Sequence, residues 1–329
     1  MASEMLYPIM PAFLNSIGFS VFFIGILEGL AEATAGLSKG YFGRLSDISG
    51  KRVPFVRLGY ALSAISKPLL GFFIHPVWVF FSRTIDRFGK GIRTGARDAI
   101  LSGESTPQTK ARVFGLHRSM DTIGATLGPL LALVYLYFHP GEYRMLFYLA
   151  FLPGFIAVLA ACSLKENKNI SQVSKPRNNS LSLLKYWQES SGAYKRLVLG
   201  LLLFELFNSS DMFLLLRIKE SGVNDTYVVG AYIFYNLVYA LFAFPAGMLA
   251  DKIGMKNVFI IGLFLFAVVY AGMSHYNSIV AFIALFFLYG IFAATTDGIS
   301  KAWISSIIGK NEAASGLGLF AGMQSIVAL

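Results

Sequence analysis

Long apolar stretches follow one another along this 329-residue chain, and short polar connections separate them. About 20 predominantly apolar residues are enough for an α-helix to cross the hydrocarbon core of a membrane. Membrane-spanning strands alternate polar and apolar residues instead, and no long alternation occurs here. The pattern therefore predicts an all-α transmembrane protein with full crossings at about 20–42, 54–75, 77–99, 112–138, 144–164, 194–217, 225–249, 257–275 and 278–304.

Composition supports membrane lipid as the surroundings of the chain. Hydrophobic residues make up 55% and charged residues only 14%, against about 25% charged residues in soluble domains. The net charge of +10 does not predict nucleic acid as a partner, because the basic residues lie between apolar spans. A single cysteine, Cys162, allows no disulfide framework. We find neither metal-ligand spacing nor a nucleophile–base set, so we expect no enzyme, no metal and no cofactor.

Lysine and arginine in short connections predict which loops face the cytoplasm. Basic residues gather at 43–57, 105–112 and 165–196, whereas most of the alternate connections are poor in them, 217–220 being the exception. We therefore expect these three basic connections on the cytoplasmic side.

One ten-residue pattern occurs twice. "GRLSDISGKR" at 43–52 returns as "GMLADKIGMK" at 247–256, and each reads G-x-L-small-D-x-x-G-x-basic between two apolar spans. A polar stretch separates the copies, so we expect an N-terminal helical bundle at 1–164, a cytoplasmic linker at 165–193 and a C-terminal bundle at 194–329. Repeated membrane bundles of this kind place a substrate path between them.

The repeated pattern resembles the cytoplasmic signature of the Major Facilitator Superfamily, G-x-L-A-D-R-x-G-R-K, found between helices two and three and between helices eight and nine. The stretch "DRFGKGIRTGARDAI…FGLHRSMDTIGATLGP" further resembles a group of prokaryotic members, many without assigned substrates. The resemblance implies two pseudo-symmetric six-helix bundles in a prokaryotic inner membrane, acting as a monomer. The residues that carry over as a gating motif are Gly43, Asp47, Gly50, Arg52, Gly247, Asp251 and Gly254.

Six helices per half is one more than the five complete crossings before the linker. "MASEMLYPIMPAFLN" resembles the outer end of helix one, and "GLGLFAGMQSIVAL" at 316–329 resembles the first part of helix eleven. We therefore expect a fragment truncated at both ends, with an unusual short form as the alternative.

Asp47 has two interpretations. The glycines Gly43 and Gly50 permit a tight turn and a close approach of helices. By resemblance, Asp47 meets the positive N-terminal end of a helix in the other half and a nearby arginine, and so favours one of two transport states. The alternative is that Asp47 only caps a helix.

Ionisable residues inside the crossings are costly, so they predict function. Glu28 and Glu32 lie four apart on one helix face with Gly25 and Gly29. Two neighbouring acids do not ionise equally, which makes one of them a candidate proton site. A permanent ion pair with a base on a neighbouring helix is the alternative.

The crossing at 77–99 is the most charged. Arg83, Arg87 and Lys90 form one stripe, and Asp86 is placed to pair with Arg83 or Lys90. "RFGKG" resembles the R-x-x-Q-G element of the superfamily, whose arginine is tied to proton transfer. This role carries over to Arg87, although Lys90 replaces the glutamine.

The next crossing places Arg118 and Asp121 before a small-residue element. Asp121 is within reach of His117 or Arg118. The run Gly124-x-x-x-Gly128-Pro129 resembles the helix-five element of antiporters, where the proline bends the helix. Close packing of small residues without a direction of transport is the alternative.

In the second half, Asp297 precedes Lys301 by four residues and predicts a pair on one helix face. Glu4 and Asp211 occupy equivalent places in the two repeats, in "SEMLYP" and "SDMFLL". We expect the acids Glu4, Asp211 and Asp297 to line a water-filled cavity.

These features predict a secondary active transporter that works by alternating access and exchanges a small organic solute or drug for protons. Uptake by proton symport uses the same acids and is the first alternative. A non-transporting membrane receptor or scaffold is the alternative from another class. The sequence does not name the solute.

Overall fold

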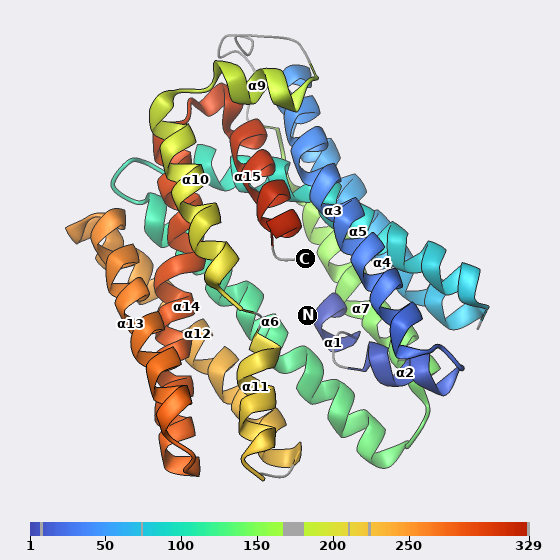
Figure 1. Ribbon diagram of the computed structural model, residues 1–329. Helices are drawn as coiled ribbons and strands as arrows, with labels where there is room; N and C mark the ends of the chain where they lie inside the picture. The colour runs from blue at the N-terminus through green and yellow to red at the C-terminus, as the bar shows by residue number, and fades with distance from the viewer. Residues whose placement is uncertain (7–8, 74, 167–180, 210, 223–224, 328–329) are drawn as a thin grey trace. The chain divides into compact units, whose positions relative to one another are not determined.

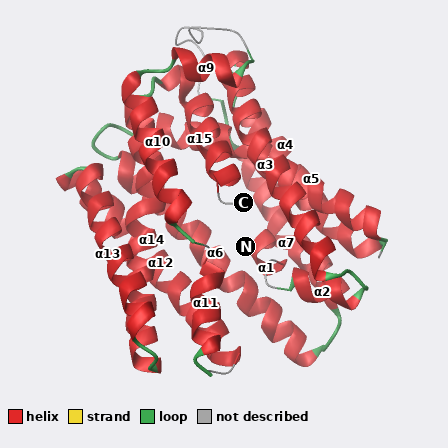
Figure 2. Ribbon diagram, viewed as in Figure 1, coloured by secondary structure: helices red, strands yellow, loops and turns green. Residues whose placement is uncertain are grey.

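The computed structural model describes residues 1–6, 9–73, 75–166, 181–209, 211–222 and 225–327. These residues form helices and connections and contain no strand (Figures 1 and 2). The fold class predicted from the apolar stretches is therefore confirmed. The helices are α1 (Ala2–Leu6), α2 (Met10–Ser16), α3 (Val21–Ser49), α4 (Val53–Phe72), α5 (Pro76–Gly103), α6 (Lys110–Phe138), α7 (Tyr143–Ser163), α9 (Leu183–Glu189), α10 (Gly192–Phe207), α11 (Asp211–Glu220), α12 (Asp225–Ile253), α13 (Met255–His275), α14 (Ile279–Ile307), the 3-10 turn η1 (Lys310–Glu312) and α15 (Ala313–Val327).

Contacts divide the chain into two compact units, which are described separately. The first unit comprises Met1–Gly103, Leu127–Leu202 and Ile307–Leu329, and the second comprises Glu104–Thr126 and Leu203–Ser306.

Five of the described helices are long and apolar enough to cross a membrane, namely α6, α7, α12, α13 and α14. Two other long helices, α3 and α5, contain several ionisable residues each. These charged helices therefore need partners within the protein, because an isolated charge in hydrocarbon is costly.

Both copies of the repeated motif are largely helical rather than loops. α3 continues through Ser49 and ends at Gly50, whose φ of 63° is the left-handed conformation that glycine adopts readily. α12 continues through Ile253, and Gly254 has a φ of 96°. The expected turn therefore spans only 50–52 in the first motif and Gly254 in the second.

The crossing expected at 194–217 is wrong as a single helix. α10 ends at Phe207, and α11 begins at Asp211, with the polar residues Asn208 and Ser209 between them. The backbone N–H of Asn208 still donates to Phe204, but polar side chains that compete for backbone groups favour helix ends over helix interiors. The first described residues likewise form two short helices, α1 and α2.

In the first unit, α5 packs between α3 and α4, while α4 also contacts α7 and α3 also contacts α15 (Figure 1). The short helices α1 and α2 are held by an apolar core. Phe13 of α2 meets Phe147 of α7 edge to face, with ring centroids 4.8 Å apart. This burial holds Glu4, at the start of α1, within the unit.

In the second unit, α12 contacts α11 and α13, and aromatic side chains fill the space around α14. Tyr235 of α12 stacks near Tyr289 of α14 at 5.0 Å, and Phe266 of α13 lies 5.3 Å from Phe292 of α14. The unit therefore presents tyrosine hydroxyl groups beside its acidic residues.

Candidate functional site

Asp47, near the end of α3, caps the start of α15. One carboxylate oxygen accepts the backbone N–H of Ser315 at 2.6 Å and the Ser315 hydroxyl at 2.7 Å, and the other accepts the backbone N–H of Ala314 at 3.3 Å. The first backbone N–H groups of a helix have no partner within it and carry its positive end, so a carboxylate is favoured there. The contact implied by the resemblance is therefore present.

Arg52 ties the same place to α5, to η1 and to the beginning of the linker. Its guanidinium lies 3.7 Å from the Asp47 carboxylate and donates to the carbonyl oxygens of Ala99, at 3.0 Å, and Lys310, at 2.5 Å. The backbone N–H groups of Arg52 and Val53 donate to the carboxylate of Glu166. Glu166 thereby caps α4, and the beginning of the linker is tied to the motif.

The Asp47 carboxyl group titrates unusually. It lies beyond the crossing predicted at 20–42 and is buried, and burial raises its pKa from 3.8 to about 6. Arg52 and the hydrogen bonds from Ser315 and Ala314 favour the charged form, but they only partly offset the loss of water.

Asp251, near the end of α12, makes the matching contact in the second unit. Its carboxylate oxygens accept the backbone N–H of Ala111 at 2.9 Å and of Arg112 at 3.1 Å, at the start of α6. The Arg112 side chain also donates to this carboxylate at 3.1 Å. We name these contacts the α3–α15 seam and the α12–α6 seam.

The first glycine of each motif brings two backbones into direct contact. A Cβ built on Gly43 would lie 2.3 Å from the carbonyl oxygen of Ala314, and one built on Gly247 would lie 2.5 Å from that of Ala111. No real Cβ is tolerated at such distances. The motif glycine therefore allows the helices to approach closely enough for the aspartate to reach the partner helix.

A second glycine, on the partner helix, repeats this arrangement one turn further on. A Cβ on Gly318 of α15 would lie 2.4 Å from the carbonyl oxygen of Lys39, and one on Gly115 of α6 would lie 2.5 Å from that of Ala243. Each of these residues in the α3–α15 seam therefore has an equivalent in the α12–α6 seam. The equivalent lies 204 positions later on the motif helix and 203 positions earlier on the partner helix.

The acids of α3 pair with arginines of α5. Arg83 donates to both oxygens of Glu28, at 2.5 and 2.7 Å from one nitrogen, while Arg87 lies 3.4 Å from Glu28 and 2.7 Å from Glu32. The Glu28 and Glu32 side chains are 29% and 32% exposed. The ion-pair alternative for these acids is therefore the arrangement found, and it remains accessible from outside the protein.

Asp86 points to a different helix than expected. Its ion pair is with Lys67 of α4, at 2.6 Å, and the Ser63 hydroxyl donates to the same oxygen. The Lys67 and Asp86 side chains are 1% and 6% exposed, and Lys67 also donates to Ser3 of α1 at 3.1 Å. The expected pairing with Arg83 or Lys90 is therefore replaced by a dry pair between α4 and α5.

Two other candidates lie at the edge of this charged cluster. Glu4 is half-buried in the first turn of α1 and acts electrostatically on Arg87. Lys90 is half-buried on α5 and acts in the same way on Glu32.

Arg118 of α6 is the centre of a polar cluster in the second unit. It donates to Asp297 of α14 at 2.7 Å and to the hydroxyl of Tyr239 of α12, and Tyr239 donates to Asp297 at 2.6 Å. Asp121, one turn along α6, lies 3.3 Å from Arg118. The pair of Arg118 with Asp121 was expected, whereas the partners of Asp297 on other helices were not.

Asp211 lies near the Arg118 cluster, since Asp297 and Arg118 act on it electrostatically. Asp211 begins α11 and accepts the hydroxyl of Tyr289 at 2.5 Å. Gly124 and Pro129 are buried within a continuous α6, and a Cβ on Gly128 would lie 2.8 Å from the backbone nitrogen of Met5. Gly128 thus allows α1 to pack directly on α6, while the bend at Pro129 stays a prediction.

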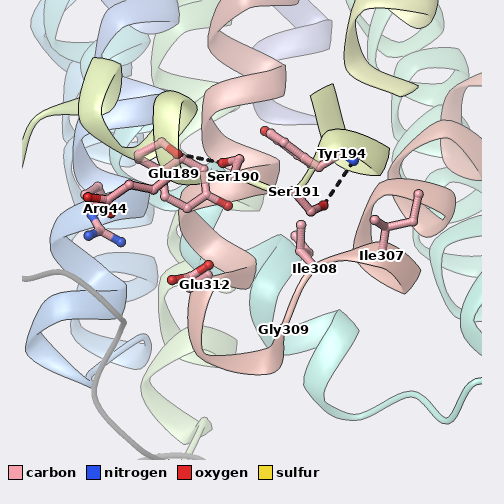
Figure 3. A pocket seen from close by; sticks show the side chains of 10 residues that line it. Arg44, Glu189, Ser190, Ser191, Tyr194, Ile307, Ile308, Gly309 and Glu312 are labelled. Carbon is pink, nitrogen blue, oxygen red and sulfur yellow. Dashed lines mark hydrogen bonds between the residues drawn. The ribbon is translucent and has the colours of Figure 1, made fainter. Parts of the chain in front are cut away.

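A pocket of about 180 Å³ lies beside the α3–α15 seam in the first unit, lined by α9, the start of α10, η1 and Arg44 of α3 (Figure 3). The Arg44 guanidinium lies over the ring of Tyr186, 5.3 Å from its centroid. The Tyr194 hydroxyl donates to the carbonyl oxygen of Gly316 in α15 at 2.9 Å. The described part of the linker therefore packs against this seam.

Sequence reasoning missed Lys67, Tyr239 and Glu166. Lys67 is a lysine within an apolar crossing, the same signal that marked Glu28, and was available to find. Tyr239 carries no such signal, because tyrosines are common in these spans.

Comparisons with known proteins agree with this architecture. The sequence model of the Major Facilitator Superfamily matches residues 1–328. An uncharacterized MFS-type transporter of Methanocaldococcus jannaschii is 36% identical over 329 residues, which cover 97% of this chain and 80% of that protein. The efflux pump azaK of Aspergillus niger is 33% identical over 111 residues, 33% of this chain and 23% of that protein.

The crystal structure of the human organic anion transporter MFSD10 has the same fold. It aligns with 99% of this chain and 87% of its own, with a TM-score of 0.82 and 17% sequence identity. Together with the match over nearly the whole sequence, the helical fold identifies the chain as a member of the Major Facilitator Superfamily, an integral membrane transporter that works by alternating access.

Proposed function

We propose that this transporter exports a small organic solute in exchange for protons. The observation that carries the proposal is the cluster of Glu28, Glu32, Arg83 and Arg87 between α3 and α5. A charge near the centre of a membrane helix costs roughly 2.5–3.5 kcal/mol on insertion scales, so such groups persist where they serve transport. Two carboxylates that are about one third exposed suit proton exchange with water.

The geometry supports a simple coupling step. Arg87 is shared by Glu28 and Glu32, so a proton on either carboxylate removes one of its two ion pairs. The charge that the proton removes is then no longer available to hold a solute in the same cluster, so solute and proton compete for it. One charge moving across 100 mV releases about 2.3 kcal/mol, which sustains roughly a 40-fold solute gradient.

The seams supply the alternation. We place the motif ends of α3 and α12 in the cytoplasm of a prokaryotic cell, with 1–164 and 194–329 as two bundles joined by the linker 165–193, in a monomer. Asp47 and Asp251 each join a helix of one bundle to a helix of the other. In this proposal both contacts belong to the state closed at the motif ends, and both must part for the solute to enter from the cytoplasm.

Export rather than uptake is supported by two sequence features. The run Gly124, Gly128, Pro129 resembles the antiporter element, and the relative azaK is named an efflux pump. Uptake by symport would use the same acids, so direction requires its own test.

The test uses the full chain in proteoliposomes with a panel of radiolabelled organic cations, anions and neutral drugs. We expect at least one solute to accumulate against its concentration gradient when the imposed pH gradient drives protons in the direction opposite to solute movement. No accumulation is expected when the pH gradient is reversed. Glu28→Gln and Glu32→Gln should abolish this pH-driven accumulation, while Glu142→Gln, at a carboxylate that contacts only Tyr135 among the bonds described, serves as the control. Accumulation driven by a pH gradient of the other sign would establish symport and overturn export.

A further inference from the structure

The two seams match each other position by position for several turns and then diverge. Their third contact still corresponds: a Cβ on Gly322 would lie 2.7 Å from the carbonyl oxygen of Gly36, and the Ser119 hydroxyl donates to the carbonyl oxygen of Ala240 at 2.5 Å. The same spacing of 204 and 203 positions relates these residues. Residues that differ between the two seams at positions with this spacing are therefore structurally equivalent.

The next positions are small and dry in one seam and polar in the other. The α3–α15 seam has Ala35 and Ala321, which are 0% and 5% exposed. The equivalent positions of the α12–α6 seam hold Tyr239 and Arg118. The second seam therefore carries a charged bridge at these positions, whereas a charged group crosses the first seam nearby, where Lys39 of α3 donates to the Ser325 hydroxyl of α15 at 2.5 Å.

The bridge joins three helices. Arg118 on α6 reaches Asp297 on α14, and Tyr239 on α12 donates to the same carboxylate oxygen that accepts from Arg118. The guanidinium carbon of Arg118 also lies over the ring of Tyr239, 5.1 Å from the ring centroid. Because the tyrosine touches both charged groups, it holds the arginine toward Asp297 rather than toward Asp121 alone.

The two seams also respond differently to charge. The α3–α15 seam responds to charge through Asp47, which is buried at the motif end and binds the backbone of α15. The Arg118 and Asp297 side chains are 37% and 42% exposed, so water replaces the bridge when it breaks. Removing one partner then weakens the seam without leaving a fully buried charge.

We propose that Arg118, positioned by Tyr239 and paired with Asp297, is the switch that holds the α12–α6 seam closed, a role that the alanines at the equivalent positions of the α3–α15 seam, Ala35 and Ala321, do not fill. The proposal rests on the proposed alternating access, since the seam must part during transport. Asp121 contacts the same arginine from within α6, at 3.3 Å, and this contact does not cross the seam.

The experiment measures the distance across the seam by electron spin resonance on the full chain in nanodiscs, without solute or pH gradient. Spin labels replace Gln108, before α6, and Ile253, at the end of α12, both of which are exposed, in a background where the exposed Cys162 is serine. The variants are Asp297→Asn, Tyr239→Phe, Arg118→Gln and the double variant of Arg118→Gln with Asp297→Asn. The matched control is Asp121→Asn, which removes the same charge from the same arginine.

We expect Asp297→Asn and Arg118→Gln to raise the ratio of open to closed molecules about tenfold, the effect of losing one charged hydrogen bond. The double variant should shift the ratio no further than either single change, because both remove one bridge. Tyr239→Phe should give a smaller rise, and Asp121→Asn should leave the distance distribution unchanged.

An equal shift in Asp121→Asn and Asp297→Asn would show a general effect of net charge and overturn the proposal, as would an unchanged distribution in Asp297→Asn. If Asp297→Asn does not fold, Tyr239→Phe decides in the same way. Because no transport is measured, a negative result leaves proton-coupled export standing, and failure of the transport assay leaves the switch testable.

Discussion

Asp47→Asn should tighten the α3–α15 seam at neutral pH. The Asp47 carboxyl group is buried when α15 is docked, and its pKa rises there from 3.8 to about 6. A raised pKa means that the docked state binds the proton more tightly. The contribution of this group to docking is therefore complete below a pH of about 3.8 and is lost as the pH rises through about 6. Asparagine has no charge and escapes that loss.

The magnitude follows from the same values. The difference between 3.8 and about 6 corresponds to about 3 kcal/mol of lost docking free energy above pH 6. Asparagine retains one oxygen for the backbone N–H of Ser315, at 2.6 Å in the native contact, and gives up the second acceptor, at a cost of about 1 kcal/mol. The net gain of about 2 kcal/mol corresponds to roughly a 30-fold larger closed population.

Spin labels at Lys51 and Lys310, both exposed on either side of the seam, report the closed population in the Cys162→Ser background. In the native protein this population should fall between pH 5 and pH 7.5, whereas Asp47→Asn should hold it high and independent of pH. Ser315→Ala removes the hydroxyl donor at 2.7 Å and should lower the closed population several-fold at both pH values. An opened seam in Asp47→Asn, or a native protein that closes further as the pH rises, would refute the linkage reasoning.

Three further changes test the packing. Lys67→Met should lower the free energy of unfolding by about 3–5 kcal/mol, because it leaves the Asp86 carboxylate buried without its cation. Thermal unfolding in detergent measures this loss, and an unchanged midpoint would contradict the dry pair. Gly43→Ala should separate α3 from α15, since its Cβ would lie 2.3 Å from a carbonyl oxygen, whereas Gly25→Ala, with no atom within 4 Å, should not; disulfide cross-linking across the seam distinguishes them. Glu166→Gln should cost about 1 kcal/mol as a lost charged cap of α4, read from amide hydrogen exchange at the start of that helix, and unaltered exchange would argue against the cap.

The sequence predicts the helices well because they depend on local pattern, whereas the contacts of the motif aspartates are long-range. Apolar stretches of the required length predict helices wherever they occur, and the aspartate of each motif is placed by a glycine one turn earlier. Asp47 binds Ala314, which lies 267 positions later in the chain, and Asp251 binds Ala111, which lies 140 positions earlier. The resemblance implied the first of these contacts.

Pairings between helices are less predictable, because spacing along one helix does not show what faces it. Asp86 has Arg83 and Lys90 at helical spacing, yet it pairs with Lys67 across the α4–α5 contact. Asp297 has Lys301 at four residues, yet Arg118 and Tyr239 are the partners found on other helices.

The break between α10 and α11 has a similar origin. Hydropathy averaged over 194–217 conceals the polar run at 208–211, since apolar residues on both sides dominate the average. Short polar side chains form hydrogen bonds with nearby backbone groups and so compete with the hydrogen bonds of the helix. This effect is local, and the helix ends at Phe207.

The central claim is that solute and proton compete within one charged cluster, and proton release on solute binding tests it most directly. A solute identified by the transport screen is added to the purified full chain in weakly buffered nanodiscs with a pH indicator. The account predicts that the native protein releases protons as the solute binds, and that the variant with both Glu28→Gln and Glu32→Gln binds without release. Saturable binding to the native protein with no change in pH would contradict it.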